Sequence, residues 1–522
     1  MKRLVSLLLV SVMLMGAIVG CTAKTPADDT QQSPPPATGN VPAESAGPAE
    51  PAKKDTLVVG ISVEPQTLNV AEVGLLYTDT VNRLLYDTLV RLDQDMNVVP
   101  QLAESFEPLS DTEWKFVLRE GVKFSDGSVV TSEDAKASIE LVAASAAIGA
   151  YAGWLKEIKI IDERTFIVVT KQPSERMLAD LCTYSFIVPK KLIDSGYNFS
   201  EGPVGTGPYR LVEWKRGDRL IFVANDEYFL EEDRAAIKNL IWRIMPEGIA
   251  RTIALENGEV DFLFDVQASD LKQLEANENI EVYSTPYASP FYIAFNLNKP
   301  GMDNLNVRKA IAAAINRDNA TLLATDGYSP TFYSCAIPGM LGSTNENAEP
   351  YNVEKAKEYI AASGLSGDQL KFTVICKEEP FKIALESIQA DLLEIGVALD
   401  VQMMDTATYT ARGAEGSFDM ITGKYNAFDL LAYAEGAFKT GAAFNFNFIS
   451  DPYIDGLIEK GTGTIDNEAR GAIIEELISY CNGLALRTGI YQLTTIRAFN
   501  KDLGGFTTNL NSYDRFNKLY WK

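Results

Sequence analysis

The stretch from Leu102 to Glu140 constrains the fold most, because strand, turn and helix patterns follow one another along it. Trp114, Phe116 and Leu118 occupy alternate positions, which is the period of a strand with one buried face. The pattern breaks at Gly121 and resumes directly after it. The sequence therefore predicts two short strands joined by a turn.

A helix is predicted directly after these strands. The run Ser125 to Ser128 contains Asp and Gly, which tolerate the backbone angles of a tight turn. Thr131 with Asp134 three residues later is typical of a helix N-terminus, where the threonine caps the helix. One apolar face follows, formed by Ala135, Ile139 and Val142. The residues by themselves predict a structural unit and no chemistry.

Charge and composition exclude several classes of function. The chain has 522 residues and a net charge of −24, which argues against binding nucleic acid or lying on an anionic membrane surface. It contains no histidine, which excludes histidine-based catalytic triads and histidine-ligated metals. Its length favours about three domains.

The five cysteines show no metal-binding or redox spacing. Cys182, Cys335, Cys376 and Cys481 are most simply small buried apolar residues. A disulfide among them would be compatible with an oxidising compartment, and the sequence leaves that question open.

The N-terminal residues have the composition of a secretory signal. Lys2 and Arg3 precede a short apolar run that ends in Val19-Gly20-Cys21. This ending resembles the lipobox of bacterial lipoproteins, in which the cysteine carries lipid, so Cys21 is the expected lipidation site. Residues 1–20 are then the signal, and residues 21–55 are a proline-rich, apolar-poor linker that is not expected to fold.

Gly202 to Tyr209 is rich in glycine and could suggest a phosphate-binding loop. No Lys-Ser or Lys-Thr follows to complete that motif, and Arg210 to Trp214 reads as a strand where a helix would be required. Nucleotide binding is therefore not expected.

Later residues alternate between helical and strand patterns. Residues 371–376 form a predicted strand, the apolar positions of 385–395 predict a helix, and residues 397–403 alternate as a second strand. A helix capped by Asn467 is predicted further on. This order is typical of an α/β layer.

The stretch from Pro100 to Asp134 also carries a family resemblance. Its spaced residues are similar to those of bacterial extracellular solute-binding proteins of family 5, the peptide, nickel and opine type that serves ABC importers. GTGPY at 205–209, ALENGEVD at 254–261 and VRKAIAAAINR at 307–317 resemble further motifs of that family. The resemblance implies a two-lobed α/β periplasmic-binding-protein fold with an extra small domain, a discontinuous first domain and a hinge between the lobes.

Domain boundaries follow from the resemblance. It implies a first domain made of residues 56–92, 201–295 and 496–522, a second of 93–200, and an opposing lobe of 296–495. The implied protein is a monomeric lipoprotein outside the cytoplasm that delivers an extracellular solute to a membrane permease. No cofactor, metal or catalytic residue is expected.

The resemblance also implies ligand contacts. It places Tyr77, Tyr151 and Trp154 at positions where relatives contact the ligand, although aromatic residues packed in a core would explain Tyr151 and Trp154 as well. In residues 418–429, oligopeptide-binding relatives carry an aspartate that holds the peptide's ammonium group. Ungapped matching puts Phe428 at that position and Asp429 one residue late, so either a local insertion restores the clamp or the clamp is absent.

The residue types in this region suit a binding cleft independently of the match. A buried ammonium needs an opposing carboxylate, and clefts combine aromatic with polar groups. The candidate ligand-binding residues are Tyr77, Trp154, Tyr425, Asn426, Phe428, Asp429 and Asn445.

Three functions remain open from the sequence. An importer receptor for oligo- or dipeptides is the favoured hypothesis. A receptor of the same family for a metallophore–nickel complex, an opine or an oligosaccharide is the alternative. A surface-anchored hydrolase with paired carboxylates is the third, and no motif places such a pair.

Overall fold

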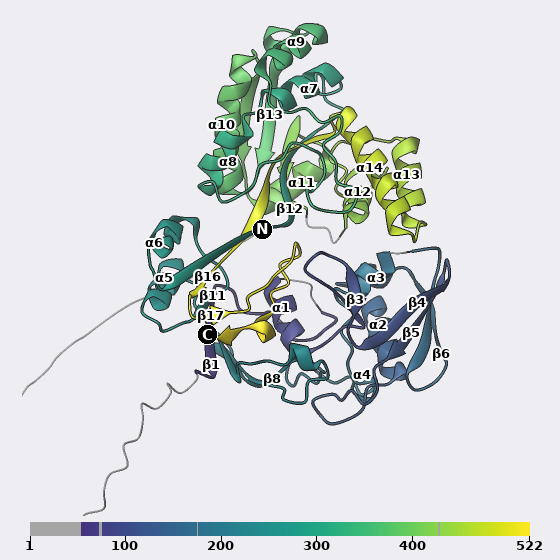
Figure 1. The fold of residues 1–522 in the computed structure, drawn as a ribbon. Coiled ribbons are helices and arrows are strands. Elements are labelled where there is room, and N and C mark those ends of the chain that lie inside the picture. Colours follow the sequence, from purple (N-terminus) through teal and green to yellow (C-terminus); the bar gives the residue numbers. More distant parts are fainter. Residues whose placement is uncertain (1–53, 73–75, 175, 426–428) are drawn as a thin grey trace, which may run out of the picture. The chain divides into compact units, whose positions relative to one another are not determined.

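A computed structural model gives the fold and describes residues 54–72, 76–174, 176–425 and 429–522. Its main sheet joins ten of the strands found in these residues (Figure 1). Their spatial order is β14 (Ala398–Met403), β13 (Lys371–Cys376), β15 (Met420–Gly423), β12 (Ile280–Phe295), β16 (Arg487–Asn500), β11 (Phe262–Leu263), β1 (Thr56–Ile61), β10 (Asn239–Ile244), β9 (Arg219–Ala224) and β8 (Tyr209–Lys215).

A separate sheet lies in the residues expected to form the second domain. Its four strands pair antiparallel, and the alternating strand predicted around Trp114 is its β5. Trp114, Phe116 and Leu118 are all buried there, which confirms the predicted period. The second strand, predicted after Gly121, is wrong, because that segment forms only a single bridge between Lys123 and Val129. The order is β4 (Ala103–Ser110), β5 (Glu113–Leu118), β7 (Thr165–Thr170) and β6 (Leu155–Ile160). Two strand pairs stand apart, β2 (Val90–Leu92) with β3 (Val98–Pro100) and β17 (Leu503–Gly504) with β18 (Tyr520–Trp521).

The helices fall into two groups. We call residues 54–295 with 496–522 the first lobe and residues 296–495 the opposing lobe. No helix within the described residues is long and apolar enough to cross a membrane. The first lobe contains α1 (Leu76–Leu85), α2 (Ser132–Ala144), α3 (Arg176–Leu181), α4 (Lys190–Asp194), α5 (Gly248–Glu256) and α6 (Leu271–Glu275), with single turns η1 (Gly149–Ala152), η2 (Glu231–Asp233), η3 (Ala268–Asp270) and η5 (Phe516–Lys518). The opposing lobe contains α7 (Leu305–Ala314), α8 (Arg317–Thr325), α9 (Val353–Ser363), η4 (Gly367–Leu370), α10 (Glu379–Glu394), α11 (Thr406–Glu415), α12 (Leu430–Phe438), α13 (Pro452–Thr462) and α14 (Asn467–Gly483).

Two long strands connect the lobes. β12 and β16 pair antiparallel along most of their length, and Figure 1 shows both running from one lobe into the other. At one end Ile280 and Ala498 belong to a core of the first lobe, and at the other Phe291 and Ile490 belong to a core of the opposing lobe. Their register shifts between Pro286 and Pro290, which interrupts the ladder between these cores. This interruption gives the shared sheet a place to bend.

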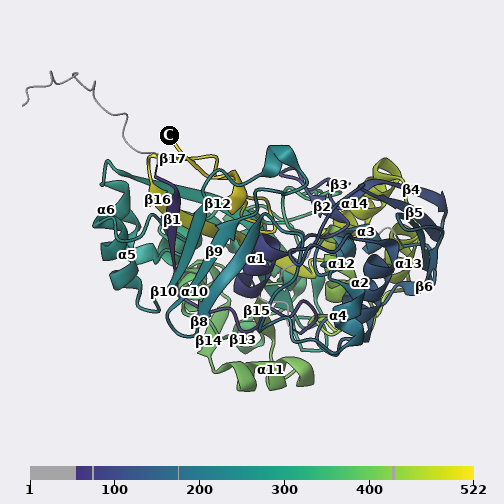
Figure 2. The same ribbon diagram turned by 90° about the horizontal axis from the view of Figure 1, so that it is seen from below.

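On the first-lobe side, β1 runs parallel to β10, which pairs antiparallel with β9 (Figure 2). Trp242 of β10 is fully buried and packs against the rings of Phe264 and Phe516. Phe516 belongs to the C-terminal segment, so that segment forms part of this core.

Local sequence predictions can be compared with the structure. Thr131 is the N-cap of α2, and its backbone N–H donates to Asp134 Oδ2 at 2.8 Å, which confirms the predicted helix start. The apolar spacing of residues 77–89 predicts a helix that reaches Leu89, but α1 ends at Leu85. The cap predicted at Asn467 is one residue off, because the side chain of Asp466 accepts from Ala469 N and caps α14. The four described cysteines are buried free thiols.

Candidate functional site

An arginine and three carboxylates meet where α3 faces α12. Arg176 begins α3, and its Nε lies 3.3 Å from Asp180 Oδ2 one turn later. Its Nη1 lies 3.2 Å from Glu435 Oε2 on α12. Asp429 precedes α12, and its charge acts on both Arg176 and Asp180. We call these four residues the Arg176 cluster.

Local sequence explains why these side chains are held in place. Asp429 is the N-cap of α12, because its Oδ1 accepts from Ala432 N at 2.9 Å. Glu435 is the single charged residue in the otherwise apolar sequence of that helix, LLAYAEGAF. Lys439 Nζ lies 3.0 Å from Glu435 Oε1 and forms the outer edge of the cluster. Asp180 is almost fully buried, whereas Arg176 and Glu435 remain partly exposed.

Electrostatics in the cluster is governed by burial and by surplus negative charge. Burial raises the pKa of Asp180 to about 7, with Arg176 opposing the rise and Asp429 adding to it. Burial by itself would lower the pKa of Arg176, but Asp180, Asp429 and Glu435 together raise it. Three carboxylates therefore share one guanidinium and the ammonium of Lys439, so a further cation would be favourable here.

Tyrosines surround the same place. Burial raises the pKa of Tyr425, and the charges of Arg176 and Tyr151 also act on its hydroxyl, which places all three near one another. The Tyr425 ring packs against Phe444 and Tyr433, with centroids 4.8 and 5.6 Å away. Tyr151 packs edge-on against Tyr184 at 4.6 Å. Polar groups among aromatic rings are the composition expected of a ligand site.

The remaining predicted residues have other surroundings. The Tyr77 hydroxyl lies 2.8 Å from Ser62 Oγ and donates to Asp265 Oδ2 at 3.1 Å, while burial, followed by the charge of Asp265, raises its pKa to about 12. Trp154 is buried in a core, and its indole N–H donates to Tyr151 O at 2.9 Å. Asn445 is buried, and its amide donates to the carbonyls of Lys439 and Ile449.

The structure therefore brings Tyr425 and Asp429 together around Arg176, and it places Trp154 beside them, because the Trp154 side chain also hydrogen-bonds to Asp180. Tyr77 and Asn445 have contacts that hold the fold. Asn426, Phe428 and Cys21 lie outside the described residues. Among the side chains that the structure describes, no three His, Cys, Asp or Glu residues are grouped to hold a metal ion.

Sequence reasoning missed Arg176, Asp180 and Glu435. Two signals were present. Asp180 lies among the apolar residues of RMLADL, and Glu435 is isolated in an apolar helix. Charged residues are rarely buried without a partner, so both positions implied an opposite charge from elsewhere in the chain. The chain distance of 259 residues between Arg176 and Glu435 kept that partner from being identified.

Comparison with known proteins gives the family. Residues 97–437 match the model described as "Bacterial extracellular solute-binding proteins, family 5 Middle". The glutathione-binding protein GsiB of Salmonella typhimurium is 26% identical over 374 residues, which cover 70% of this chain and 72% of that protein.

Solved structures show the same fold. The oligopeptide-binding protein AppA of Bacillus subtilis, in complex with a nonapeptide, aligns with a TM-score of 0.69 at 21% identity, over 91% of this chain and 100% of that one. NikA of Brucella suis, in complex with Fe(III)-EDTA, aligns with a TM-score of 0.80 at 22% identity, over 90% of this chain and 100% of that one. The chain belongs to family 5 of the bacterial extracellular solute-binding proteins, the two-lobed substrate-binding proteins of ABC importers.

Proposed function

We propose that this protein captures short peptides with a free ammonium group and delivers them to a membrane permease. The observation that carries the proposal is the Arg176 cluster, in which three carboxylates exceed the cations that face them. The ammonium of a peptide complements this arrangement, because it supplies a cation that the surplus carboxylates lack.

The location of the cluster suits a closing mechanism. Arg176 and Glu435 come from the residues assigned to different lobes, and their ion pair joins α3 to α12. A ligand that contacts groups of both lobes binds most tightly when those groups are close together, so it shifts the population toward the closed form. In this proposal the closed form is the one that docks on the permease.

The other parts of the proposal follow from the sequence. Residues 56–92, 201–295 and 496–522 form the first domain, 93–200 the second, and 296–495 the opposing lobe. Cys21 carries a lipid that anchors the monomeric protein to the cell membrane, at the outer face of the cell or in the periplasm, and the protein binds solute without catalysing a reaction. The glutathione-binding relative supports a peptide ligand.

Mass spectrometry of the solute released from purified, denatured protein tests the proposal. Peptides with free N-termini are the expected result. An opine, a chelated metal or an oligosaccharide as the sole released solute would contradict the peptide assignment and leave the family function intact. Conversion of any candidate solute to a product on incubation would contradict the binding role itself.

Binding to the cluster is tested separately. We expect the affinity for tri-alanine to rise between pH 5 and pH 7, because the peptide's ammonium, with a pKa of about 8, keeps its charge there. Over the same range a growing fraction of Asp180, whose pKa is about 7, becomes a carboxylate that attracts the ammonium. The Asp180→Asn variant should lose this pH dependence. The matched control is Asp162→Asn, which changes an exposed carboxylate of a turn in the second domain.

A further inference from the structure

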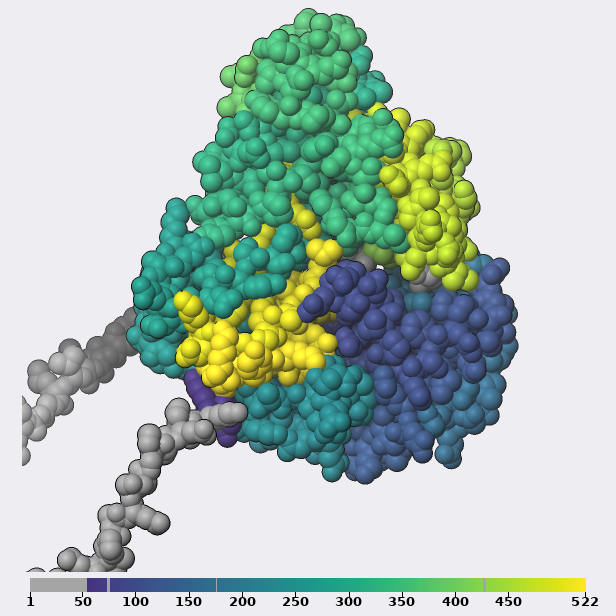
Figure 3. Space-filling model, viewed as in Figure 1, coloured from purple at the N-terminus to yellow at the C-terminus, as the bar shows by residue number. Residues whose placement is uncertain are grey.

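A second concave site lies beside the C-terminal segment and takes no lining residue from 296–495. It has a volume of about 320 Å³, and its walls are the end of α1, the residues from β2 to the following turn, and residues 507–517. We call it the C-terminal pocket. Figure 3 shows the yellow C-terminal residues beside the purple-blue residues near position 100, and the Asn509 side chain donates to Asp93 O at 3.2 Å. Pockets of this volume are at the small end of ligand sites.

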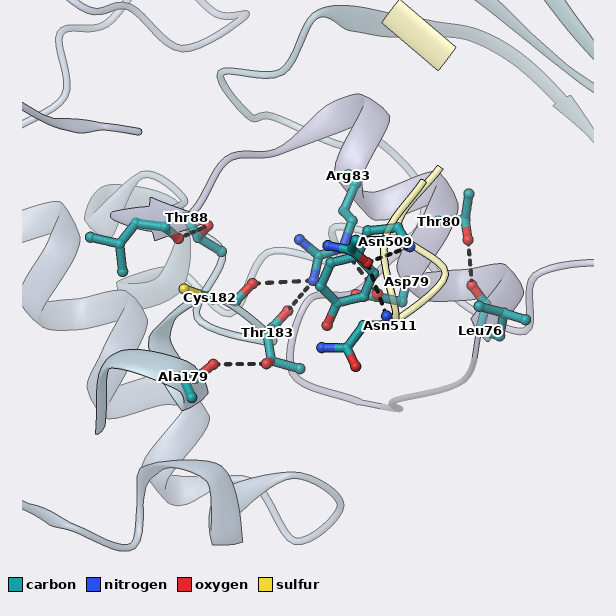
Figure 4. A network of polar contacts seen from close by, with 12 residues as sticks. Leu76, Asp79, Thr80, Arg83, Thr88, Ala179, Cys182, Thr183, Asn509 and Asn511 are labelled. Carbon is teal, nitrogen blue, oxygen red and sulfur yellow. Dashed lines mark hydrogen bonds and ion pairs between the residues drawn. The ribbon is translucent and has the colours of Figure 1, made fainter. Parts of the chain in front are cut away.

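Arg83 forms one wall of the C-terminal pocket and is hydrogen-bonded to other groups of the protein (Figure 4). Its Nη2 donates to the carbonyls of Cys182 and Thr183 at 3.2 and 3.1 Å, and its Nε donates to Asp79 Oδ2 at 3.0 Å. The guanidinium also lies 3.6 Å from the centroid of the Tyr513 ring. Arg83 therefore supports the wall, and its charge is already paired with Asp79.

Two other arginines of the pocket belong to a group in which cations outnumber carboxylates. Arg91 and Arg515 both line it, and together with Lys518 they face the single carboxylate of Asp233. Arg515 Nη2 lies 2.6 Å from Asp233 Oδ2, Lys518 contacts Oδ1, and Arg91 Nη2 is 3.7 Å away. We call these four residues the Asp233 cluster. Three cations against one carboxylate leave an excess of two positive charges.

Arg91 is the least satisfied member. Its Nε is buried and has no hydrogen-bond partner. Among the residues that the structure describes, Asp233 is the one carboxylate within ion-pair range of Arg91, and it is already held more closely by Arg515 and Lys518. Burial, followed by the charge of Arg515, lowers the pKa of Arg91. A partly buried guanidinium without a close partner is costly, and an added anion would remove that cost.

Other carboxylates of the pocket are occupied within the protein. Asp87 accepts hydrogen bonds from Thr206 and Tyr228 at 2.7 and 2.8 Å and from Gln101. Asp514 is fully buried and pairs with Arg497 at 2.7 Å. Asp93 and Asp95 also line the pocket, and Asp93 accepts from the backbone N–H groups of Asp95 and Asn97 at 2.9 and 2.8 Å. The charge of Asp87 acts on Arg91, but among the described carboxylates Asp233 alone lies within ion-pair range of it.

We propose that the C-terminal pocket binds a small oxyanion, a carboxylate or phosphate group. The guanidinium of Arg91, beside Arg515, donates two hydrogen bonds to it. The planar guanidinium offers two parallel N–H donors to such a group. Because no lining residue comes from 296–495, this ligand does not bridge the lobes, and its binding is independent of the Arg176 cluster.

Thermal melting and calorimetric titration test the proposal with citrate and with inorganic phosphate, each against sodium chloride at equal ionic strength. Wild-type protein should melt at a higher temperature in at least one of the two anions. Arg91→Gln should bind that anion at least tenfold more weakly and, in chloride, should be as stable as wild type, because it removes the repulsion with Arg515. Arg91→Lys, which keeps the charge without the two parallel N–H donors, should bind weakly as well.

Arg243→Gln is the matched control, because this half-buried arginine of β10 bonds a backbone carbonyl and should leave anion binding unchanged. A response to citrate alone identifies a carboxylate site, and a response to phosphate alone identifies a phosphate site. No response to either anion, or an equal response in Arg91→Gln and wild type, would overturn the proposal. Loss of the response in Asp429→Asn would place the anion in the Arg176 cluster and would overturn it as well.

Discussion

The Arg176 cluster and the Asp233 cluster are opposites in charge. In the first, one arginine faces three carboxylates, and in the second, one carboxylate faces three cations. Burial raises the pKa of Asp180 to about 7, whereas Lys518 and Arg515 overcome the effect of burial and hold the pKa of Asp233 below its ordinary value. Burial therefore does not decide the charge state of a carboxylate by itself; the number of cations around it does.

The same comparison separates structural from ligand-directed charge. Asp233 has more partners than it needs, so it holds η2 to the C-terminal segment. Asp180 has less than one full positive charge to balance it, because Arg176 also pairs with Glu435 and is acted on by Asp429. A site that is short of cations is suited to a cationic ligand group.

The largest effect is expected for Asp233→Asn. It leaves three cations without their carboxylate, and the free energy of unfolding at pH 7 should fall by about 3 kcal/mol in urea denaturation. Because the folded protein lowers the pKa of Asp233, its stabilisation is present above the ordinary aspartate pKa and is lost as the pH falls through the lowered value. The difference between variant and wild type should therefore shrink in strong acid.

The control for Asp233 is Asp226→Asn. Asp226 also pairs with a lysine, Lys238, but its side chain is mostly exposed, so the loss of stability should be much smaller than for Asp233→Asn. Equal losses for the two variants would mean that the Asp233 cluster contributes no more than a surface ion pair.

Asp180→Asn should change the free energy of unfolding in the opposite direction, because it should stabilise the protein at high pH. The folded protein raises the pKa of Asp180, so its contribution to stability is full below about pH 4 and is lost as the pH rises through about 7. At pH 8 the variant should be more stable than wild type by about 1–2 kcal/mol, and near pH 4 the two should unfold alike. Urea denaturation at both pH values checks this, and a less stable variant at pH 8 would show that Arg176 fully compensates the buried charge.

Asp429→Asn should weaken binding of a peptide ammonium about tenfold, or roughly 1.4 kcal/mol. Asparagine is also a good N-cap, so α12 should remain intact, whereas Asp429→Ala would lose the cap as well. Asp451→Asn changes the equivalent cap of α13, where Asp451 Oδ1 accepts from Tyr453 N, and should leave peptide affinity unaltered. If both cap variants bind as wild type does, Asp429 is a cap and nothing more.

The smallest change in stability is expected for Glu435→Gln. The ion pair with Arg176 is about one-third exposed on both sides, and Arg176 keeps Asp180 when it is lost. The free energy of unfolding should change by less than about 1 kcal/mol. A larger loss in urea denaturation would show that α3 and α12 depend on this contact.

Much of the fold could be predicted from the sequence because local patterns specify it. The alternation of Trp114, Phe116 and Leu118 and the cap at Thr131 depend on neighbouring residues and are confirmed. The apolar pattern predicts an end for α1 that is four residues too late, because Leu89 continues the pattern although it is buried outside the helix. Apolar periodicity reports burial, and burial alone does not extend a helix.

The candidate site could be predicted only in part. Tyr425 and Asp429 were found because they lie in one stretch whose composition suits a cleft. Their partners Arg176 and Asp180 come from a distant helix, and no local rule reveals that α3 faces α12. Asp429 was predicted as a ligand clamp, and that assignment stays a prediction beside its observed hydrogen bond as a helix cap.

Calorimetric titration with tri-alanine and with N-acetyl-tri-alanine tests the central claim most directly, because acetylation removes the ammonium charge and leaves most of the peptide unchanged. We predict that tri-alanine binds wild-type protein at pH 7, where its ammonium is charged, at least tenfold more tightly than the acetylated peptide. Asp429→Asn and Asp180→Asn should each reduce this difference in affinity. Equal affinity for the two peptides would contradict the account, because it would show that the surplus carboxylates of the Arg176 cluster do not recognise the ligand's ammonium.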